Sequence, residues 1–266
     1  MAVQSKFLAV GAAVPWVSAD AGAVATQSWA NTSFGPHGLA KLRSGLHPEI
    51  VLQELLADDS DREQRQVGIV DLQGRSATFT GSECFPYAGG IAGEGFACQG
   101  NILAGSAVVE ALASSFITSE GPLPERLVKA LQAGQKAGGD RRGMQSAALY
   151  VAKPQGGYGG FNDRYIDLRV DDHASPIDEL EHLLELHRLY FERSKQEDLL
   201  PLEGEVLREV QQRLRQAGYQ PDDAASYTDV TKEALKAYYL TENFDERWTE
   251  EAVIDRRVLA YLRKGE

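Results

Sequence analysis

Two amide side chains near the middle of the sequence could bind a small polar molecule. Gln99 and Asn101 flank Gly100 at the end of an expected strand, so both side chains lie on one face. In that position they can hydrogen-bond an amide substrate. Alternatively, they cap the helix that is expected to begin at Ser106.

A charged loop offers a second candidate binding site. Asp140, Arg141 and Arg142 lie between Gly139 and Gly143, just before an expected strand. Two neighbouring guanidinium groups can hold a carboxylate or a phosphate through paired hydrogen bonds. Asp140 can equally bind the arginines in a structural ion-pair network, and the sequence leaves both interpretations open.

The acidic and sulfur side chains do not form the pattern of a metal or thiol site. Asp163, Asp167 and Asp171 recur along an expected strand, which spreads them over roughly 26 Å, too far for one ion. This spacing favours a solvated or ion-paired face, so we expect no metal and no cofactor. Cys84 and Cys98 lack a CxxC spacing or a paired histidine, which predicts unreactive thiols.

The composition excludes several functional classes. The 266 residues include 27 Lys and Arg against 39 Asp and Glu, a net charge of −12. Because this leaves no positive surplus, a generic nucleic-acid or anionic-membrane binder is excluded. The sequence contains no stretch of about 18 apolar residues, so it predicts no membrane-spanning helix. Two cysteines fit a reducing compartment better than a disulfide scaffold.

The elements that must position these residues follow the order strands, helices, strands, helices, which is typical of a layered α+β fold. We expect a turn at Val14-Pro15, a glycine-rich loop at 89–95 and a helix cap at Ser33. The expected strands are 3–10, 22–30, 65–71, 76–80, 96–102, 143–153 and 163–170. The expected helices are 38–44, 48–57, 106–119, 124–137 and 176–193.

Glycine usage indicates a second domain. Of the 26 glycines, 23 precede residue 194, and the remaining chain is compact and helical. Helices are expected after Pro201, after Thr228 and over 248–263. The sequence therefore predicts a small all-α domain at 200–266, joined to the first domain through 194–200.

The first 23 residues allow two interpretations. Lys6, the apolar run 7–14 and the small residues 18–21 resemble a secretory signal. Alternatively, 3–10 and 22–30 are two buried strands, and Pro15-Trp16 interrupts the apolar run that a signal needs. The strands fit the rest of the chain better, so we expect a cytoplasmic protein.

Five segments occur in a fixed order along the chain: 5–12, 25–31, 99–103, 138–148 and 162–173. Together they resemble a bacterial family of uncharacterised Ntn-hydrolase-like proteins. The resemblance covers 1–194 and implies a four-layer αββα sandwich of the proteasome-subunit type. The tail, 200–266, resembles a peptidoglycan-binding domain that is often appended to this family.

Ntn hydrolases attack an amide with an N-terminal Thr, Ser or Cys, whose own α-amine acts as the base. Members of the family usually begin with an extra strand that bears a Thr directly after Met. This chain starts inside the following strand, and Ala2 offers no nucleophile. We therefore expect either an upstream segment or an inactive form, and the strand-like run 3–6 favours an upstream segment.

The resemblance also implies site residues. Ser5 and Lys6 would flank the missing nucleophile, where the lysine charge would lower the pKa of an attacking group. Alternatively, Lys6 is an exposed strand end. The substrate-binding residues that the matching segments imply are Gln27, Asn31, Gln99, Asn101, Asp140, Arg141 and Ser146.

Two functions follow as hypotheses. The first is an amidohydrolase that acts on or binds an amide-like or peptide-like small molecule, with peptidoglycan fragments as a further partner of the tail. The second is a non-catalytic binding or assembly protein that uses the sandwich and the tail. Because Ntn-type sandwiches commonly pair, fold analogy also suggests a homodimer.

Overall fold

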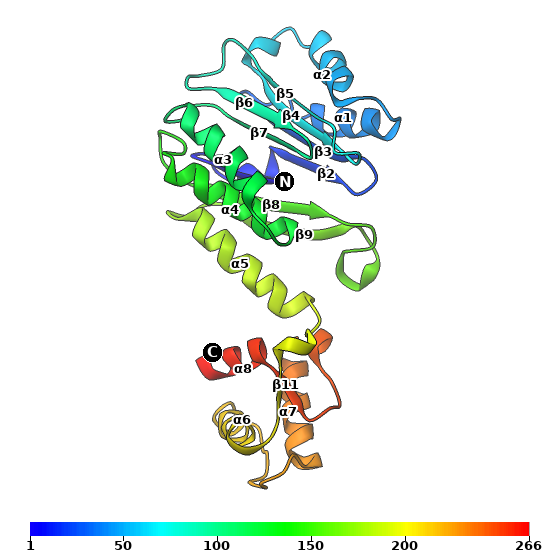
Figure 1. Ribbon diagram of the computed structural model, residues 1–266, viewed down its shortest axis with the longest axis vertical. Coiled ribbons are helices and arrows are strands. Elements are labelled where there is room, and N and C mark those ends of the chain that lie inside the picture. Colours follow the sequence, from blue (N-terminus) through cyan, green and yellow to red (C-terminus); the bar gives the residue numbers. More distant parts are fainter. Residues whose placement is uncertain (266) are drawn as a thin grey trace. The chain divides into compact units, whose positions relative to one another are not determined.

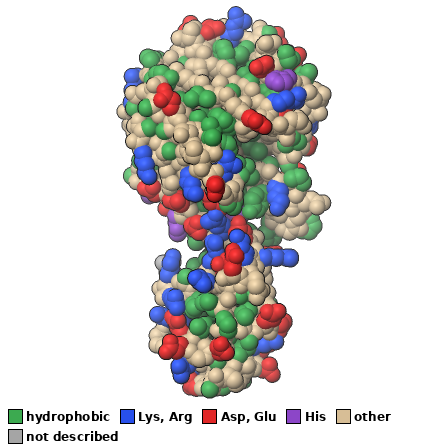
Figure 2. Space-filling model, viewed as in Figure 1, with side chains coloured by type: hydrophobic (Ala, Val, Ile, Leu, Met, Phe, Trp, Pro, Cys, Tyr) green, Lys and Arg blue, Asp and Glu red, His purple; other side chains and the backbone are tan. Residues whose placement is uncertain are grey.

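The computed structural model describes residues 1–265, which form two units, Met1–Leu184 and a second that begins at Glu185 (Figure 1). The division falls within helix α5 (Pro176–Phe191), earlier in the chain than the joint that the glycine distribution predicts. Acidic and basic side chains are interspersed on the face shown in Figure 2. Among the described residues, no helix combines the length and apolar character needed to cross a bilayer.

The first sheet of the N-terminal unit is antiparallel, and helices α1 (Phe34–Arg43) and α2 (Pro48–Ala57) cover one of its faces (Figure 1). Val24, Val67 and Ile69 are fully buried beneath these helices. The strands, in spatial order, are β2 (Pro15–Ser18), β3 (Gly22–Gln27), β4 (Gln66–Asp71) and β5 (Ser76–Thr80).

The second sheet packs against helices α4 (Leu123–Lys136) and α5 through a separate core that includes Leu149, Ile166 and Leu180. Its antiparallel strands, in spatial order, are β1 (Ala2–Ser5), β8 (Ser146–Ala152) and β9 (Arg164–Val170). Beside the sheets lie the ribbon of β6 (Gly89–Gly93) and β7 (Phe96–Gly100) and the helices α3 (Ser106–Thr118) and α4 (Leu123–Lys136).

The first segment of the chain differs from the prediction. The expected strand 3–10 ends at Ser5, and a turn and a short 3-10 helix, Val10–Ala12, follow. Ala9 adopts a left-handed conformation, φ 51°, which no strand permits. The turn expected at Val14-Pro15 lies one residue earlier, at Ala13-Val14, because Pro15 already begins β2.

Three further predictions concern local structure. The segment Gly89–Gly93 is strand β6 rather than a loop, because it pairs antiparallel with β7. It also lies close to β5, since a Cβ on Gly90 would be 2.6 Å from Thr78 Oγ1. The expected helix 38–44 already begins at Phe34, and Ser33 caps nothing, since its hydroxyl donates to Asn31 Oδ1. The helix over 48–57 is confirmed.

The C-terminal unit contains helices α6 (Gly204–Gln216), α7 (Asp229–Thr241) and α8 (Arg256–Lys264) around a core that includes Phe244. The predicted cap is confirmed, since Thr228 Oγ1 accepts from the Thr231 amide.

The all-α prediction is wrong because β10 (Leu199–Pro201) pairs with β11 (Val253–Asp255). The expected helix over 248–263 starts at Arg256, where the Asp255 carboxylate accepts from the Arg257 amide and caps α8.

Candidate functional site

The N-terminal unit encloses a cavity of about 960 Å³, which we call the amide cavity. Strands β1, β3 and β7 and helices α3 and α4 contribute to its wall. Most of the lining is apolar, with Leu112 and Phe116 from α3 and Leu127 and Leu131 from α4. A cavity of this size and character is typical of a site for a small organic ligand.

Three glutamines that line this cavity each carry a buried amide atom. Gln4 Nε2, Gln99 Oε1 and Gln135 Oε1 have no hydrogen-bond partner among the described residues, and all three residues line the cavity. A buried polar atom without a partner costs about 1–3 kcal/mol of stability. The residues that line the cavity therefore include three amide atoms whose hydrogen-bonding capacity the described chain leaves unused.

Two glycines make room for these amides. A Cβ on Gly68 would lie 2.3 Å from Gln99 Oε1, and a Cβ on Gly139 would lie 2.4 Å from Gln135 Oε1. Gly139 also has a φ of +57°, which disfavours other residues. The backbone of Gly68 thus contacts the Gln99 amide, and the backbone of Gly139 contacts the Gln135 amide. Any larger residue at either glycine would clash with the amide.

A fourth glutamine, Gln66, is fully buried and fully bonded. Its Nε2 lies 2.9 Å from both Thr80 Oγ1 and the Gly100 carbonyl oxygen. Its Oε1 accepts from Gln27 Nε2 at 2.8 Å and from Asn101 Nδ2 at 3.2 Å. Gln27 and Asn101, which the resemblance implies as substrate-binding residues, thus bind the side chain of Gln66.

The charged loop forms an ion pair through Arg142. The Arg142 guanidinium donates to both carboxylate oxygens of Asp140, at 3.0 and 2.7 Å, and the Lys6 amide lies 3.3 Å from Oδ2. Burial raises the pKa of Asp140, but these hydrogen bonds outweigh it and hold the pKa below its usual range. Arg141 is exposed and does not line the amide cavity, whereas Asp140 and Arg142 do.

The serines predicted at the site have different surroundings. Ser5 lines the amide cavity and lies opposite Ser146 in the β1–β8 register. Ser146 is fully buried and holds the turn after β1, donating to the Phe7 carbonyl at 2.5 Å and accepting from the Val10 amide at 3.0 Å. Lys6 is exposed, and its ammonium group donates to a backbone carbonyl. Within residues 1–265, no hydrogen bond joins Ser5 Oγ to a base.

Asn31 binds an ion pair next to the cavity. Its Nδ2 donates to Asp59 Oδ2 at 2.9 Å, and Arg65 Nε donates to the same oxygen at 2.9 Å. Arg65 also donates to the Trp29 carbonyl at 2.5 Å and lines the cavity. The Arg65 hydrogen bond lowers the pKa of Asp59 to about 2.

Among the described residues that line the cavity is one cysteine, Cys98. Burial raises the pKa of its thiol to about 11, so it stays protonated and weakly nucleophilic near pH 7. Cys84 is buried, with Sγ 3.4 Å from the Arg65 carbonyl oxygen. The described part of the chain holds no cluster of three or more metal-ligating side chains.

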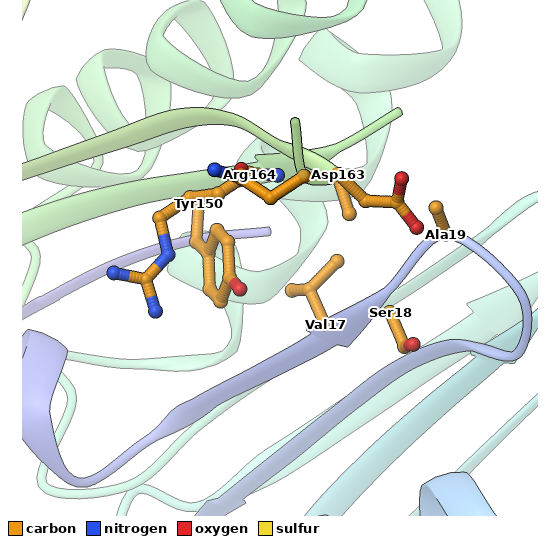
Figure 3. A pocket seen from close by; sticks show the side chains of 8 residues that line it. Val17, Ser18, Ala19, Tyr150, Asp163 and Arg164 are labelled. Carbon is orange, nitrogen blue, oxygen red and sulfur yellow. Dashed lines mark hydrogen bonds between the residues drawn. The ribbon is translucent and has the colours of Figure 1, made fainter. Parts of the chain in front are cut away.

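A second pocket, of about 450 Å³, lies between β2 and the β8–β9 hairpin (Figure 3). Tyr150, Asp163 and Arg164 line it opposite Val17 and Ser18. Asp163 accepts from a backbone amide, and the Arg164 guanidinium lies 5.8 Å from the Tyr150 ring centre. Since these polar groups have protein partners, the amide cavity is the better candidate site.

Comparison with known proteins identifies a family model that matches the part of the chain that forms this cavity. Residues 1–180 match the model of a family of unknown function, DUF1028. The chain belongs to this family. The crystal structure of protein SPO2555 from Silicibacter pomeroyi, assigned to the same DUF1028 model, is 32% identical in sequence and matches with a TM-score of 0.64. The match covers 70% of this chain and 82% of that chain.

The C-terminal part of this DUF1028 protein matches a second model. Residues 190–262 match the model described as "Putative peptidoglycan binding domain". None of the curated proteins that were compared with the chain matches it. All the residues of the amide cavity lie within the DUF1028 part.

Proposed function

We propose that the DUF1028 unit binds a small amide-like or peptide-like molecule in the amide cavity. The observation that carries the proposal is the group of three buried amide atoms without protein partners, set in an apolar wall. A ligand carbonyl can accept from Gln4 Nε2, and ligand N–H groups can donate to the oxygens of Gln99 and Gln135. An amide or peptide group offers both kinds of atom.

We propose binding without hydrolysis for the residues described. Hydrolysis of an amide requires an activated nucleophile, and the Cys98 thiol is kept protonated by burial. The succession of helices, two sheets and helices supports the inference of an Ntn-type sandwich, in which a terminal Thr, Ser or Cys would act beside Ser5. Release of amine from N-acyl amides, with a Ser5→Ala variant as comparison, tests this alternative.

Calorimetric titration with N-acetyl-L-alanine methylamide tests the binding proposal. Gln135→Leu should weaken binding about tenfold, because the variant loses a hydrogen bond in a buried site. Gln132→Leu is the matched control, since Gln132 is on the same helix but donates to Glu181 at the surface. The proposal fails if the amide does not bind, or if both variants bind it as the original protein does.

We propose further that the C-terminal unit binds peptidoglycan. The family match supports this, and the half-buried rings of Tyr219, Tyr227, Trp248 and Tyr261 around the core could contact sugar rings. The full chain should sediment with purified peptidoglycan, and soluble muropeptides should release it. A chain that stays in the supernatant would exclude this partner.

Two wider predictions belong with this proposal. If the protein is cytoplasmic, its peptidoglycan ligands are fragments recycled inside the cell, and cell fractionation tests the compartment. Light scattering of the purified full chain tests the homodimer.

A further inference from the structure

The pocket in Figure 3 presents hydrogen-bonding groups of its own, separate from the amide cavity. Its lining comes from residues 17–19, 150, 152 and 162–164, none of which belongs to β1 or lines the amide cavity. Its volume of about 450 Å³ lies within the range of pockets that hold a small organic ligand.

Asp163 offers this pocket a carboxylate oxygen. Asp163 Oδ1 accepts from the Gln155 amide at 2.8 Å, which ties the side chain to the turn between β8 and β9. No described residue is bonded to Oδ2. The residue is exposed, so Oδ2 can accept from a ligand cation without the loss of an existing hydrogen bond.

Arg164 offers donors of the opposite charge. Its Nη1 lies 3.3 Å from Asp167 Oδ2, and its guanidinium carbon lies 5.8 Å from the Tyr150 ring centre. Within the described chain Nε and Nη2 have no partner, and this edge of a guanidinium can bind both oxygens of a carboxylate. Figure 3 shows the Arg164 guanidinium and the Asp163 carboxylate on opposite sides of the Tyr150 ring.

An uncharged region separates these two charges. The Tyr150 hydroxyl lies between them in Figure 3 and is hydrogen-bonded to no other described residue. A phenol can both donate and accept, so it can bond either side of an amide group. Val17 and Ala152 add apolar surface to the lining. The pocket thus offers an acceptor for a cation, a partner for an amide and a pair of donors for a carboxylate.

We propose that this pocket binds a short peptide with free ends, in its zwitterionic form. The peptide's ammonium group binds Asp163, its carboxylate binds Arg164, and its amide bonds to the Tyr150 hydroxyl. A ligand that carries only negative charge is disfavoured because Asp163 repels it. A single amino acid carries both charges on one carbon atom and has no amide. This site goes beyond the function proposed for the amide cavity and does not depend on it.

Calorimetric titration of the full chain with L-alanyl-L-alanine tests the proposal. N-acetyl-L-alanyl-L-alanine lacks the positive charge, L-alanyl-L-alanine amide lacks the negative charge, and L-alanine lacks the amide. Each should bind about tenfold more weakly than the dipeptide, because hydrogen bonds between charged groups are the stronger ones and L-alanine cannot reach both. Failure of the dipeptide to bind would overturn the proposal, and so would L-alanine binding as tightly as the dipeptide.

Two variants assign the charged ends to their partners. Asp163→Asn keeps an oxygen that can accept from the Gln155 amide, and it should weaken dipeptide binding about tenfold without changing the affinity for the N-acetyl analogue. Arg164→Gln should do the same for the dipeptide and spare the C-terminal amide. Arg169→Gln is the matched control, because Arg169 lies on the same strand and pairs with Asp171 outside the pocket.

Equal effects of a variant on the dipeptide and on its matching analogue would overturn the assignment of that end. Thermal unfolding shows whether the variants fold, and if one does not, the four ligands decide with the original protein.

Competition between ligands distinguishes this site from the amide cavity. Saturating N-acetyl-L-alanine methylamide should change the dipeptide affinity by less than about twofold, because the two sites share no lining residue. Displacement of the dipeptide by the methylamide would place it in the amide cavity and overturn this inference. If the methylamide does not bind at all, the function proposed for the amide cavity fails, and the dipeptide measurements still test this site.

Discussion

Replacing Gln99 by Leu should stabilise the empty protein and weaken ligand binding at the same time. Gln99 Oε1 is buried without a partner in the described chain, which costs about 1–3 kcal/mol, and Leu removes that cost. Part of the gain is offset because Leu differs in shape from Gln. We expect a net gain of about 1 kcal/mol, which for a unit of this size raises Tm by roughly 2–4 °C.

Gln66→Leu is the matched control because it makes the same chemical change at a bonded site. The substitution removes the hydrogen-bond acceptor of Gln27 and Asn101 and leaves the Gly100 carbonyl without its side-chain donor. At about 1 kcal/mol or more for each bond, the loss is roughly 3 kcal/mol. Tm should fall by roughly 6–12 °C.

Differential scanning calorimetry of the three proteins measures both shifts, and titration with N-acetyl-L-alanine methylamide measures affinity. The reasoning holds only if the two substitutions change Tm in opposite directions. If Gln99→Leu lowers Tm as Gln66→Leu does, the Gln99 amide is satisfied in the empty protein. The cavity would then lack the unmet hydrogen bonds on which the binding proposal depends.

Three further predictions concern the surroundings of Asp59, Asp255 and Cys98. Because the folded pKa of Asp59 is about 2, its pair with Arg65 stabilises the fold above about pH 4, and this stability is lost as the pH falls toward 2. Asp59→Asn should remove that part of the pH dependence of Tm. Asp255→Ala should cost about 3–5 kcal/mol, because it leaves Arg247 buried without its carboxylate, and faster hydrogen exchange in α8 would report the loss. With a pKa near 11, Cys98 should react with iodoacetamide at pH 7.5 far more slowly than a free thiol, and an equal rate would contradict its burial.

Local signals in the sequence were sufficient for several elements. Pro48 at the first turn and regularly spaced leucines fix α2, and Gln73-Gly74 fixes the turn of the β4–β5 hairpin. Thr228 caps α7 through a hydrogen bond three residues along the chain. In each case the residues that determine the structure are neighbours in sequence.

Contacts between distant residues account for the main errors. Ser146 holds the turn after β1 from more than a hundred residues away, and the pairing of β10 with β11 joins opposite ends of the C-terminal unit. The glycine-rich segment becomes a strand because β5 and β7 lie beside it. The spacing of residues along the sequence does not predict contacts between such distant residues.

The candidate site was predictable in part. Gln99 and Asp140 were singled out from the sequence, and both line the amide cavity. Gln4 and Gln135 were missed because no motif marks them, although Gln135 precedes the glycines at 138 and 139, one of which leaves room for its amide. Gln66 is recognisable in the sequence as a polar residue followed by four apolar residues of the same strand.

The pairing of β10 with β11 has a consequence for synthesis. Leu200 lies opposite Ile254, and α8, which follows β11, supplies Val258, Leu259 and Leu262 to the same core. The ribosome makes these residues after the other helices of the unit, so the C-terminal unit can close only once they have emerged. The last described strand of the DUF1028 unit, in contrast, ends at Val170, and α5 supplies Leu180 to the same core directly afterwards. This unit can therefore fold while the rest of the C-terminal unit is still being translated.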